Sequence, residues 1–370
     1  MQRSSASFSI DSLSDGFYIR TLICAVIDWF TWDLAASIRD DNRAPCTVST
    51  EEGKSNLMQK KPIPGEDLKD SLKAAARDRL HRFFLADGDV RGALVHGTRL
   101  VQEMRNNHDL GLLETLILGH AYMGALLVAS SLKGEDRVAL KIDCSGPVGG
   151  LVAEANAYGE VRGYLKKVPI PVTKPLEDFN LSPFFGAGLI SLTRYLHDAK
   201  QPFTGQVALQ YGNIAQDLAH YYLTSEQIPT AFSLSVKFTP EGEVAGAGGL
   251  FLQVMPDAAD ATAAELEKIV YALPSLGEIC ADGSDIDAFL QTHFADLNPV
   301  LLDKPRVTFF CRCRQEEVAR ILGMLPIEEL KDIRDNGPFP VELRCHHCNT
   351  VYPFSREDVQ ALYRTRGGSE

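Results

Sequence analysis

Short apolar runs predict β-strands in the first regular part of the chain. Residues 79–85 and 90–95 have a strand composition, and Asp87-Gly88-Asp89 between them has the composition of a tight turn. Apolar residues then recur at three- and four-residue steps over roughly residues 110–132, which predicts a long helix. Alternation of apolar and polar residues over 137–143 predicts a further strand. The pattern therefore predicts a domain that mixes hairpins with helices.

The middle of the chain continues in the same style. Residues 145–164 are rich in glycine, but they carry neither a Gly-x-Gly-x-x-Gly nor a Gly-Lys-Ser/Thr pattern, so turns between antiparallel strands explain them better than a phosphate loop. Residues 205–212 have a strand pattern, and Asn213 can cap a helix that follows. Two more strands are predicted over 231–238 and 249–255. Strands interleaved with helices and joined mostly by hairpins are typical of an α+β fold.

Residues 257–303 keep a helical spacing but change in charge. They hold ten acidic residues and one basic residue, Lys268. The apolar positions at helical spacing are Leu266, Ile269, Val270, Leu273, Ile286, Phe289, Leu290 and Phe294. An acidic, amphipathic segment of this kind can fold against a neighbour and repels itself when it is undocked. An ordinary connector of two helices accounts for the pattern equally well.

The C-terminal part of the chain has short helical patterns. Helices are predicted over residues 316–322, 326–333 and 356–364. Ser355-Arg356-Glu357-Asp358 is a capping box that opens the last of them, and Asp335-Asn336-Gly337 ends the second.

Charge and hydropathy narrow the classes of function. The 370-residue chain has a formal net charge of −12, which argues against a general nucleic-acid binder with a broad basic surface. From Lys304 to the end of the chain, eleven Lys/Arg balance ten Asp/Glu. Apolar runs fall short of the ~18 residues that a membrane span needs. The run over 21–27 is cut by Asp28 and is too short for a signal peptide. We therefore expect a cytoplasmic protein without a membrane partner.

Residues 1–70 have the composition of a poorly defined N-terminal extension. They begin rich in serine, pass through a short apolar run and then become polar, and their acidic residues fit a transit peptide poorly. Met58 stands directly before Gln59-Lys60-Lys61-Pro62, where a chain could also start. We hypothesise that the leader before Met58 is dispensable.

Four of the eight cysteines occur as two close pairs near the C-terminus. Cys311 and Cys313 form a C-x-C pattern, Cys345 and Cys348 form a C-x-x-C pattern, and 31 residues separate the two pairs. Four thiols at this spacing suit one tetrahedral zinc ion of the structural type. In strand-like backbone the first two thiols point to one face, and Asn349 tolerates the left-handed geometry of a turn. Two unrelated cysteine pairs in a packed core are the alternative.

Other residues near the cysteines have two interpretations each. Four arginines adjoin the pairs in sequence, and they either lower the pKa of the thiols or only balance the charge of a four-thiolate site. These arginines are Arg306, Arg312, Arg314 and Arg344. His346 and His347 can substitute as metal ligands, although four cysteines already complete the set. The other cysteines are scattered, as is usual for reduced thiols, and they are Cys24, Cys46, Cys144 and Cys280.

The cysteine pattern after an α+β core resembles that of the heat shock protein 33 family. The members of that family are redox-regulated holdase chaperones. Four core segments also resemble the family, namely GPVGG at 146–150, GEVRGY at 159–164, SEQIPT at 225–230 and GGLFLQVMP at 248–256. The resemblance covers roughly residues 77–363, and all four cysteine positions are present. It implies a helical linker after the core and a small C-terminal zinc domain with four cysteine ligands.

The resemblance also implies a mechanism of regulation. It implies a cytoplasmic chaperone that holds one zinc ion per chain through Cys311, Cys313, Cys345 and Cys348 while reduced, and is then inactive. Oxidation is implied to form the disulfides Cys311–Cys313 and Cys345–Cys348, release zinc, and unfold the switch and linker. The active form is implied to be a homodimer that binds unfolding client proteins without ATP and hands them to ATP-dependent chaperones.

We expect four segments on this basis. Residues 1–70 are the N-terminal extension, 71–256 the α+β core chaperone domain, 257–305 the acidic amphipathic linker, and 306–370 the zinc-binding redox-switch domain. Zinc contributes about 10–16 kcal/mol in small zinc fingers, comparable to the ~5–15 kcal/mol stability of a whole domain. We therefore expect the loss of zinc to unfold the last segment and loosen the linker.

Three rival functions fit the sequence less well. A zinc hydrolase or deaminase needs an open coordination position and H-E-x-x-H or H-x-E, and the nine histidines provide neither pattern. A thioredoxin-like C-x-x-C opens a helix, whereas the next helix cap after Cys348 is Ser355. We therefore expect that the protein is not an enzyme. A zinc-ribbon nucleic-acid-binding module is the runner-up, and it predicts salt-sensitive binding of DNA or RNA.

Overall fold

Backbone contacts divide the chain into two compact units. The structure is a computed structural model, and it describes residues 57–63, 65, 67–172, 180–256, 258 and 260–367. The larger unit contains the described residues up to Arg314 together with Leu343–Tyr352. The smaller unit contains Gln315–Glu342 and the described residues from Pro353 onward. The leader before Leu57 lies outside the described residues, and the four expected functional segments stay a prediction.

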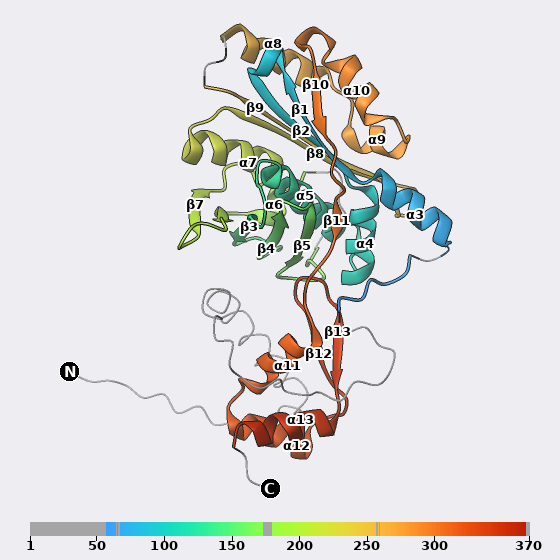
Figure 1. Cartoon of the computed structure of the whole chain (residues 1–370), viewed down its shortest axis with the longest axis vertical. Coiled ribbons are helices and arrows are strands. Elements are labelled where there is room, and N and C mark those ends of the chain that lie inside the picture. Colours follow the sequence, from blue (N-terminus) through green and yellow to red (C-terminus); the bar gives the residue numbers. More distant parts are fainter. Residues whose placement is uncertain are drawn as a thin grey trace, which may run out of the picture. The chain divides into compact units, whose positions relative to one another are not determined.

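One layer of the larger unit is a five-stranded antiparallel sheet with the strand order β10-β1-β2-β9-β8 (Figure 1). Its strands are β1 (Arg79–Leu85), β2 (Val90–His96), β8 (Thr230–Phe238), β9 (Val244–Val254) and β10 (Val300–Asp303). The predicted hairpin of β1 and β2 is confirmed, and Asp87 and Gly88 in its turn have φ angles of 54° and 107°. The strand predicted over 249–255 is also present, but it begins earlier.

The second layer is a six-stranded sheet with the order β11-β5-β4-β3-β6-β7. Its strands are β3 (Arg137–Cys144), β4 (Gly150–Asn156), β5 (Glu160–Leu165), β6 (Gly188–Tyr195), β7 (Phe203–Ala208) and β11 (Thr308–Phe309). Only β11 runs parallel to its neighbour, β5. The glycine-rich stretch forms antiparallel strands and turns as predicted, with Gly149 and Gly159 at φ angles of 67° and 81°. The α+β fold class is therefore confirmed.

The strand predicted over residues 205–212 ends at Ala208 instead. The carboxylate of Asp217 accepts hydrogen bonds from the main-chain N–H groups of Gln210, Tyr211 and Asn213, which folds the chain back toward the next helix. Asn213 caps that helix, α7 (Ile214–Tyr221), as predicted, through hydrogen bonds from the next turn to its side chain. A π-helical turn (Tyr222–Glu226) follows α7.

Helix α5 (Leu112–Ala129) packs against strands of both sheets, and it corresponds to the long helix predicted over roughly 110–132. Among the described residues it is the one helix long and apolar enough to cross a membrane, but 89% of it is buried inside the protein. Being apolar on all sides is what this central position requires. Three further helices complete the core, α3 (Leu68–Arg77), α4 (Thr98–His108) and α6 (Ser182–Phe185).

His120 lies on α5, and burial alone changes the pKa of its ring. The sequence predicts a hydrogen-bonded core histidine at this position rather than a metal ligand. The interior position is confirmed, but Nε2 of His120 has no hydrogen-bond partner among the residues that the structure describes, so the predicted hydrogen bonding is wrong at this atom. Burial therefore disfavours the charged ring and lowers its pKa to about 4.

We expect replacement of His120 by leucine to stabilise the protein, and more so at low pH. An unfolded histidine has a pKa near 6.5, so the unfolded chain binds a proton that the folded chain rejects as the pH falls from 6.5 to 4. Over this window the free energy of unfolding of the wild type falls by up to about 1.4 kcal/mol per pH unit through this proton. His120→Leu has no such group and avoids this loss. Denaturant unfolding at pH 5 and pH 7.5 measures the difference. An equal or smaller gain at pH 5 than at pH 7.5 would contradict the assignment.

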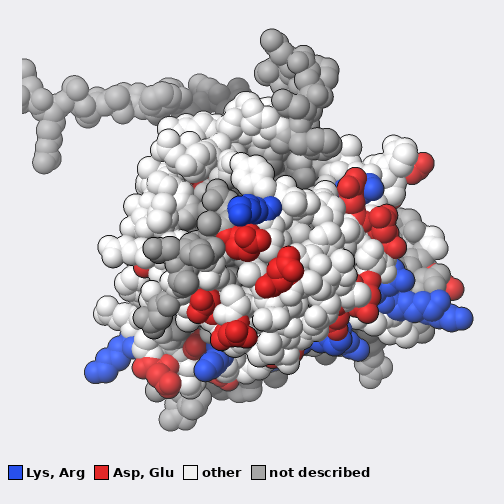
Figure 2. All heavy atoms as spheres, turned by 90° about the horizontal axis from the view of Figure 1, so that it is seen from above, with Lys and Arg blue, Asp and Glu red and all other residues white. Residues whose placement is uncertain are grey.

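Charged side chains are mixed on the face of the larger unit that Figure 2 shows. Carboxylates are interspersed with lysines and arginines there, and that face carries no continuous basic surface over its described part.

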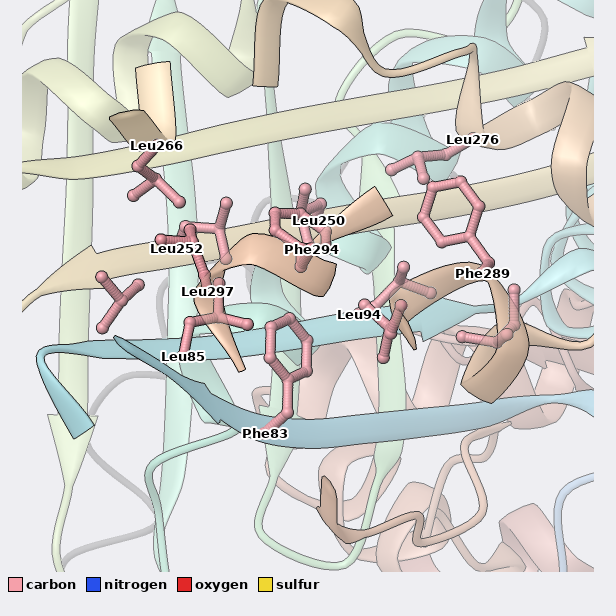
Figure 3. Close-up of a cluster of buried hydrophobic side chains, with 13 residues drawn as sticks. Phe83, Leu85, Leu94, Leu250, Leu252, Leu266, Leu276, Phe289, Phe294 and Leu297 are labelled. Carbon is pink, nitrogen blue, oxygen red and sulfur yellow. The ribbon is translucent and has the colours of Figure 1, made fainter. Parts of the chain in front are cut away.

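The segment between the core and the cysteines folds as three helices on the five-stranded sheet. They are α8 (Asp260–Ala272), α9 (Leu276–Ala281) and α10 (Ile286–His293), followed by a 3-10 turn (Ala295–Leu297). Their apolar residues join strands β1, β2 and β9 in one buried cluster (Figure 3). The cluster consists of Phe83, Leu85, Val90, Leu94, Leu250, Leu252, Leu266, Leu276, Ile286, Phe289, Leu290, Phe294 and Leu297. The prediction of an amphipathic, helical segment is thus confirmed.

The smaller unit is helical. Its helices are α11 (Gln315–Gly323), α12 (Ile327–Asn336) and α13 (Arg356–Thr365). The predicted capping box is present, because the Ser355 hydroxyl accepts from the N–H of Asp358 while the Asp358 carboxylate accepts from the N–H of Ser355. Strands β12 (Val341–Arg344) and β13 (Val351–Phe354) form a two-stranded sheet whose connecting turn belongs to the larger unit.

Candidate metal centre

The four paired cysteines meet in the larger unit. Cys311 and Cys313 follow strand β11, and Cys345 and Cys348 lie in the turn between β12 and β13. In that turn the main-chain N–H groups of Cys348 and Asn349 lie 3.4 and 2.7 Å from the carbonyl oxygen of Cys345. Asn349 has a φ angle of 55°, in the left-handed region, as the sequence predicts. We call residues 304–314 the first cysteine loop and residues 345–350 the second cysteine loop. The two loops bring their sulfur atoms together although 31 residues separate the two cysteine pairs.

The sulfur atoms are spaced as ligands of one tetrahedral ion. All four Sγ atoms lie within 4.8 Å of one another. The Cys311–Cys345 and Cys313–Cys348 sulfur pairs are 3.8 and 3.4 Å apart, and all four residues are free thiols. Zinc–sulfur bonds of about 2.3 Å place the sulfurs of a tetrahedron about 3.8 Å apart. The group can thus hold a metal ion, and a four-sulfur donor set is the one typical of structural zinc.

The ionisation of the four thiols is strongly linked. Hydrogen bonds from Cys313, Cys345 and Cys348 hold the pKa of Cys311 far below its ordinary value. Hydrogen bonds with Cys311, the larger cause, and with Cys313 raise the pKa of Cys345 and of Cys348 far above the ordinary value of a thiol. Like charges at this separation cannot all form unaided. A cation at the centre of the group would therefore allow all four thiols to become thiolates together.

Arg162 of β5 brings a positive charge from the core to the sulfurs. Its Nη1 lies 3.5 Å from Sγ of Cys311. Its Nε and Nη2 donate to one carboxylate oxygen of Glu154 on β4, at 2.9 and 2.7 Å. Burial opposes the charge on Arg162, but Glu154 and Cys311 outweigh it and raise the pKa of the guanidinium. Arg162 is thus a permanent cation beside the first cysteine loop.

The two histidines of the second cysteine loop contact the core instead of joining the sulfurs. The rings of His346 and His347 lie edge-on to the ring of Tyr164, with centroids 5.5 and 5.3 Å away. Nε2 of His347 lies 3.6 Å from a carboxylate oxygen of Glu154, and its carbonyl accepts from the N–H of Gly163. The group of potential ligands found in the described residues consists of the four cysteines. These histidines therefore fasten the loop to β4 and β5.

Two hydroxyl groups complete the surroundings of the sulfurs. The hydroxyl of Tyr352 lies 3.1 Å from Sγ of Cys313 and donates to the carbonyl of the same residue. Oγ1 of Thr350 lies 3.2 Å from Sγ of Cys348. Such outer partners orient metal ligands and tune their charge.

The arginine that contacts a sulfur is far from the cysteines in sequence. Of the four arginines expected to flank the thiols, Arg312 pairs with Glu160 at 2.8 Å and is largely exposed, which favours the interpretation as surface charge. Arg162 and Glu154 were not predicted as site residues. The GEVRGY segment contains Arg162, but in the sequence it indicated the family and not the site.

We expect replacement of Arg162 by leucine to weaken metal binding about 10- to 100-fold, the range typical for loss of an outer partner of a metal ligand. The change removes the cation beside Cys311 and leaves the charge of Glu154 close to it. Competition with a chromogenic chelator measures the affinity. Arg312→Leu is the matched control, because the guanidinium of Arg312 donates to the two carboxylate oxygens of Glu160. Equal affinities of the two variants would contradict a role of Arg162 at the centre.

Comparison with known proteins identifies the family. The sequence model of the family described as "Hsp33 protein" matches residues 78–355. The 33 kDa chaperonin of Desulforamulus reducens is 33% identical over 291 residues, which span 78% of this chain and 98% of the relative. The 33 kDa chaperonin of Thermus thermophilus is 36% identical over 300 residues, which span 77% of this chain and 86% of the relative.

A solved structure agrees with these matches. The crystal structure of the 33 kDa chaperonin (heat shock protein 33 homologue) of Thermotoga maritima has a TM-score of 0.71 to this chain at 32% identity, and the similarity covers 79% of this chain and 99% of that one. The family match extends over both sheets, the three helices on the five-stranded sheet and all four clustered cysteines. The chain therefore belongs to the Hsp33 family of chaperones.

Proposed function

We propose that the protein is a redox-regulated, ATP-independent holdase that binds unfolding proteins and prevents their aggregation. The observation that carries the proposal is the group of four free thiols with metal-ligand spacing, seated on the core of a chain from a chaperone family. In the reduced state Cys311, Cys313, Cys345 and Cys348 would hold one zinc ion and the chaperone would be inactive. A bound zinc ion would supply the positive charge that keeps the four thiolates together.

Oxidation would remove the ligands. Each pair of zinc-bound thiolates would lose two electrons as one sulfur–sulfur bond forms. Each pair would reduce one hydrogen peroxide to two hydroxide ions, which become two waters by taking two protons from solvent. We propose the pairs Cys311–Cys313 and Cys345–Cys348, which the family resemblance implies and which join nearest neighbours in sequence. All four sulfurs lie within 4.8 Å of one another, so peptide mapping of the oxidised chain is the test of this pairing.

The route from the cysteines to the linker runs through the first cysteine loop. Between Lys304 and Phe310 the chain is held by main-chain hydrogen bonds to β1 and β5 and by the buried ring of Phe309. Lys304 donates to the carboxylate of Asp287 on α10 at 2.6 Å, and His81 of β1 lies 2.7 Å from the same carboxylate. Once the loop is no longer held at its cysteine end, the contact of Lys304 with Asp287 would loosen, and α10 would be held by its buried apolar residues and by His81. Loosening of the three helices would uncover the apolar cluster of Figure 3 for clients.

The remaining parts of the proposal come from the family. The partners would be unfolding client proteins, a second copy of the chain in the oxidised state, and ATP-dependent chaperones that receive the clients. The compartment would be the cytoplasm, and the protein would carry out no catalysis. The formal net charge of −12 supports a partner other than nucleic acid.

Suppression of aggregation tests the function. We expect the reduced, zinc-loaded chain to leave the aggregation of a heat-unfolded enzyme unchanged, and the peroxide-treated chain to suppress it at near-equimolar ratio without ATP. Equal suppression by both forms would contradict redox control. Salt-sensitive binding of single-stranded DNA by the reduced chain, with no suppression in either form, would favour the zinc-ribbon alternative instead.

A further inference from the structure

A short segment that precedes the family match runs across both cysteine loops. The match begins at residue 78, whereas this segment, Leu57–Lys61, comes seventeen or more residues earlier. Leu57 forms an isolated β-bridge with Arg314, directly after the first cysteine pair. The thioether of Met58 accepts a hydrogen bond from the main-chain N–H of Cys311 at 3.0 Å. The N–H of Gln59 donates to the hydroxyl of Thr350, beside the second pair, at 3.2 Å.

Asn107 at the end of α4 joins this segment to the second cysteine loop. This residue is 1% exposed. Its Oδ1 accepts from the N–H of Lys61 at 2.9 Å, and its Nδ2 donates to the carbonyls of Gln59 and Cys348, both at 3.0 Å. The side chain of Asn349 donates to the main-chain carbonyl of Asn107 at 2.8 Å. One buried amide thus links the helix, the segment and the loop, and its three bonds leave it well satisfied.

Two lysines add ion pairs to the same helix. Nζ of Lys60 lies 2.5 Å from a carboxylate oxygen of Glu103 and donates to the hydroxyl of Thr308 on β11. Nζ of Lys61 lies 2.5 Å from the carboxylate of Asp109. The pair with Glu103 is partly buried, and the pair with Asp109 is exposed and contributes less. The segment therefore contacts the first cysteine loop, the second cysteine loop and α4 within five residues.

We propose that Leu57–Lys61 is a clamp that holds the two cysteine loops on the core and slows the opening of the cysteine centre. When the centre opens, each cysteine loop must move away from α4 or from the other loop. The clamp makes hydrogen bonds or ion pairs with α4 and with both loops. Hydrogen bonds that cross from one element to another must break before those elements separate, so they raise the barrier to local opening. The proposal rests on the proposed function, in which the four cysteines hold zinc and release it.

The roles of backbone and side chain in the clamp can be separated at two positions. The N–H groups of Gln59 and Lys61 make the bonds to Thr350 and Asn107, and proline lacks this group. The double variant Gln59→Pro/Lys61→Pro removes both bonds from the full chain. The matched control Gln59→Ala/Lys61→Ala removes the same side chains, including the exposed pair with Asp109, but keeps both N–H groups. The segment lies outside the sheets and helices, so both variants are expected to fold, and circular dichroism checks this.

Zinc transfer to a chelator in excess reductant, without oxidant, is the first measurement. We expect the proline variant to release zinc about tenfold faster than the alanine variant and the wild type, given two lost hydrogen bonds. The second measurement is hydrogen exchange of the amides of Leu343–Tyr352, which we expect to be faster in the proline variant alone. Equal release rates and equal exchange in the two variants would overturn the clamp.

The second measurement also separates the clamp from the proposed function. If the reduced wild type binds no zinc, the metal role of the cysteines is wrong. Hydrogen exchange in the loop then still decides the clamp, because the bonds to Thr350 and Asn107 exist without a metal. Faster exchange in the proline variant supports the clamp, and unchanged exchange overturns it.

Discussion

A chain in which Cys348 is replaced by serine will lose zinc and suppress client aggregation without oxidation. Cys348 is fully buried, and its Sγ lies 3.4 Å from that of Cys313. A serine hydroxyl stays protonated near neutral pH and is a poor ligand for zinc beside three thiolates. We expect metal affinity to fall by more than the 10- to 100-fold typical of outer partners. Metal analysis after desalting and light scattering of an unfolding enzyme measure the two effects.

Cys144→Ser is the matched control for this variant. Cys144 is a free, half-buried thiol outside the cluster, so its loss leaves the sulfur group intact. This variant should keep one zinc ion per chain and stay inactive while reduced. Retention of zinc by Cys348→Ser, or suppression by both variants, would contradict the role assigned to the cluster.

Replacement of Phe294 by alanine will activate the chaperone while zinc is still bound. Phe294 is fully buried after α10, and its ring centroid lies 6.2 Å from that of Phe83 on β1. Removing a buried phenylalanine costs about 3–5 kcal/mol through lost burial and the cavity left behind. The cost falls on the contact between the three helices and the sheet, which Figure 3 shows. The cysteine cluster is not part of that contact, so zinc should remain.

Hydrogen exchange of α8–α10 and suppression of aggregation in the reduced state measure this effect. Phe203→Ala is the control, since Phe203 on β7 is 61% exposed and its loss leaves no internal cavity. Faster exchange of the three helices with unchanged zinc content is the expected result. A reduced Phe294→Ala protein that opens these helices yet does not suppress aggregation would show that clients do not bind the uncovered cluster.

The parts of the fold that were predicted correctly are those in which neighbouring residues determine the structure. The β1–β2 hairpin follows from two apolar runs around Asp87-Gly88-Asp89, and α7 and α13 begin at the caps that the sequence indicates. Helix α4 was not predicted. Its buried face includes the polar residues Gln102, Glu103 and Asn107, so the sequence lacks a clear apolar stripe there. Polar residues are buried there because distant segments supply their partners.

Strand β10 was missed for a related reason. All four of its residues are exposed, so no burial period marks it in the sequence. It forms at the sheet edge because β1 offers it free main-chain partners, and Arg82 pairs with Asp303 at 2.5 Å. The strand predicted over 205–212 was too long. The N–H groups of Gln210 and Tyr211 donate to the carboxylate of Asp217, which turns the chain after Ala208. Asp217 lies on the next helix, so the pattern of the strand residues alone does not indicate this turn.

The candidate site divides in the same way. The four cysteines were predicted as metal ligands because such ligands obey local spacing rules, and the structure brings their four sulfur atoms within 4.8 Å of one another. Arg162 lies 149 residues from Cys311, and Asn107 lies 241 residues from Cys348. Only the folded arrangement of β5 and α4 places these side chains at the cysteine loops. Sequence spacing thus indicated the four cysteines of the candidate metal centre, whereas the residues that surround them required the structure.

The most direct test of the account follows zinc release and client aggregation in one sample after peroxide is added to the reduced chain. We predict that one zinc ion per chain appears as four thiols disappear, and that suppression of aggregation develops with zinc release and not before it. Suppression that reaches its full extent while zinc is still bound, or complete zinc release that leaves aggregation unchanged, would contradict control of the chaperone by the cysteine centre.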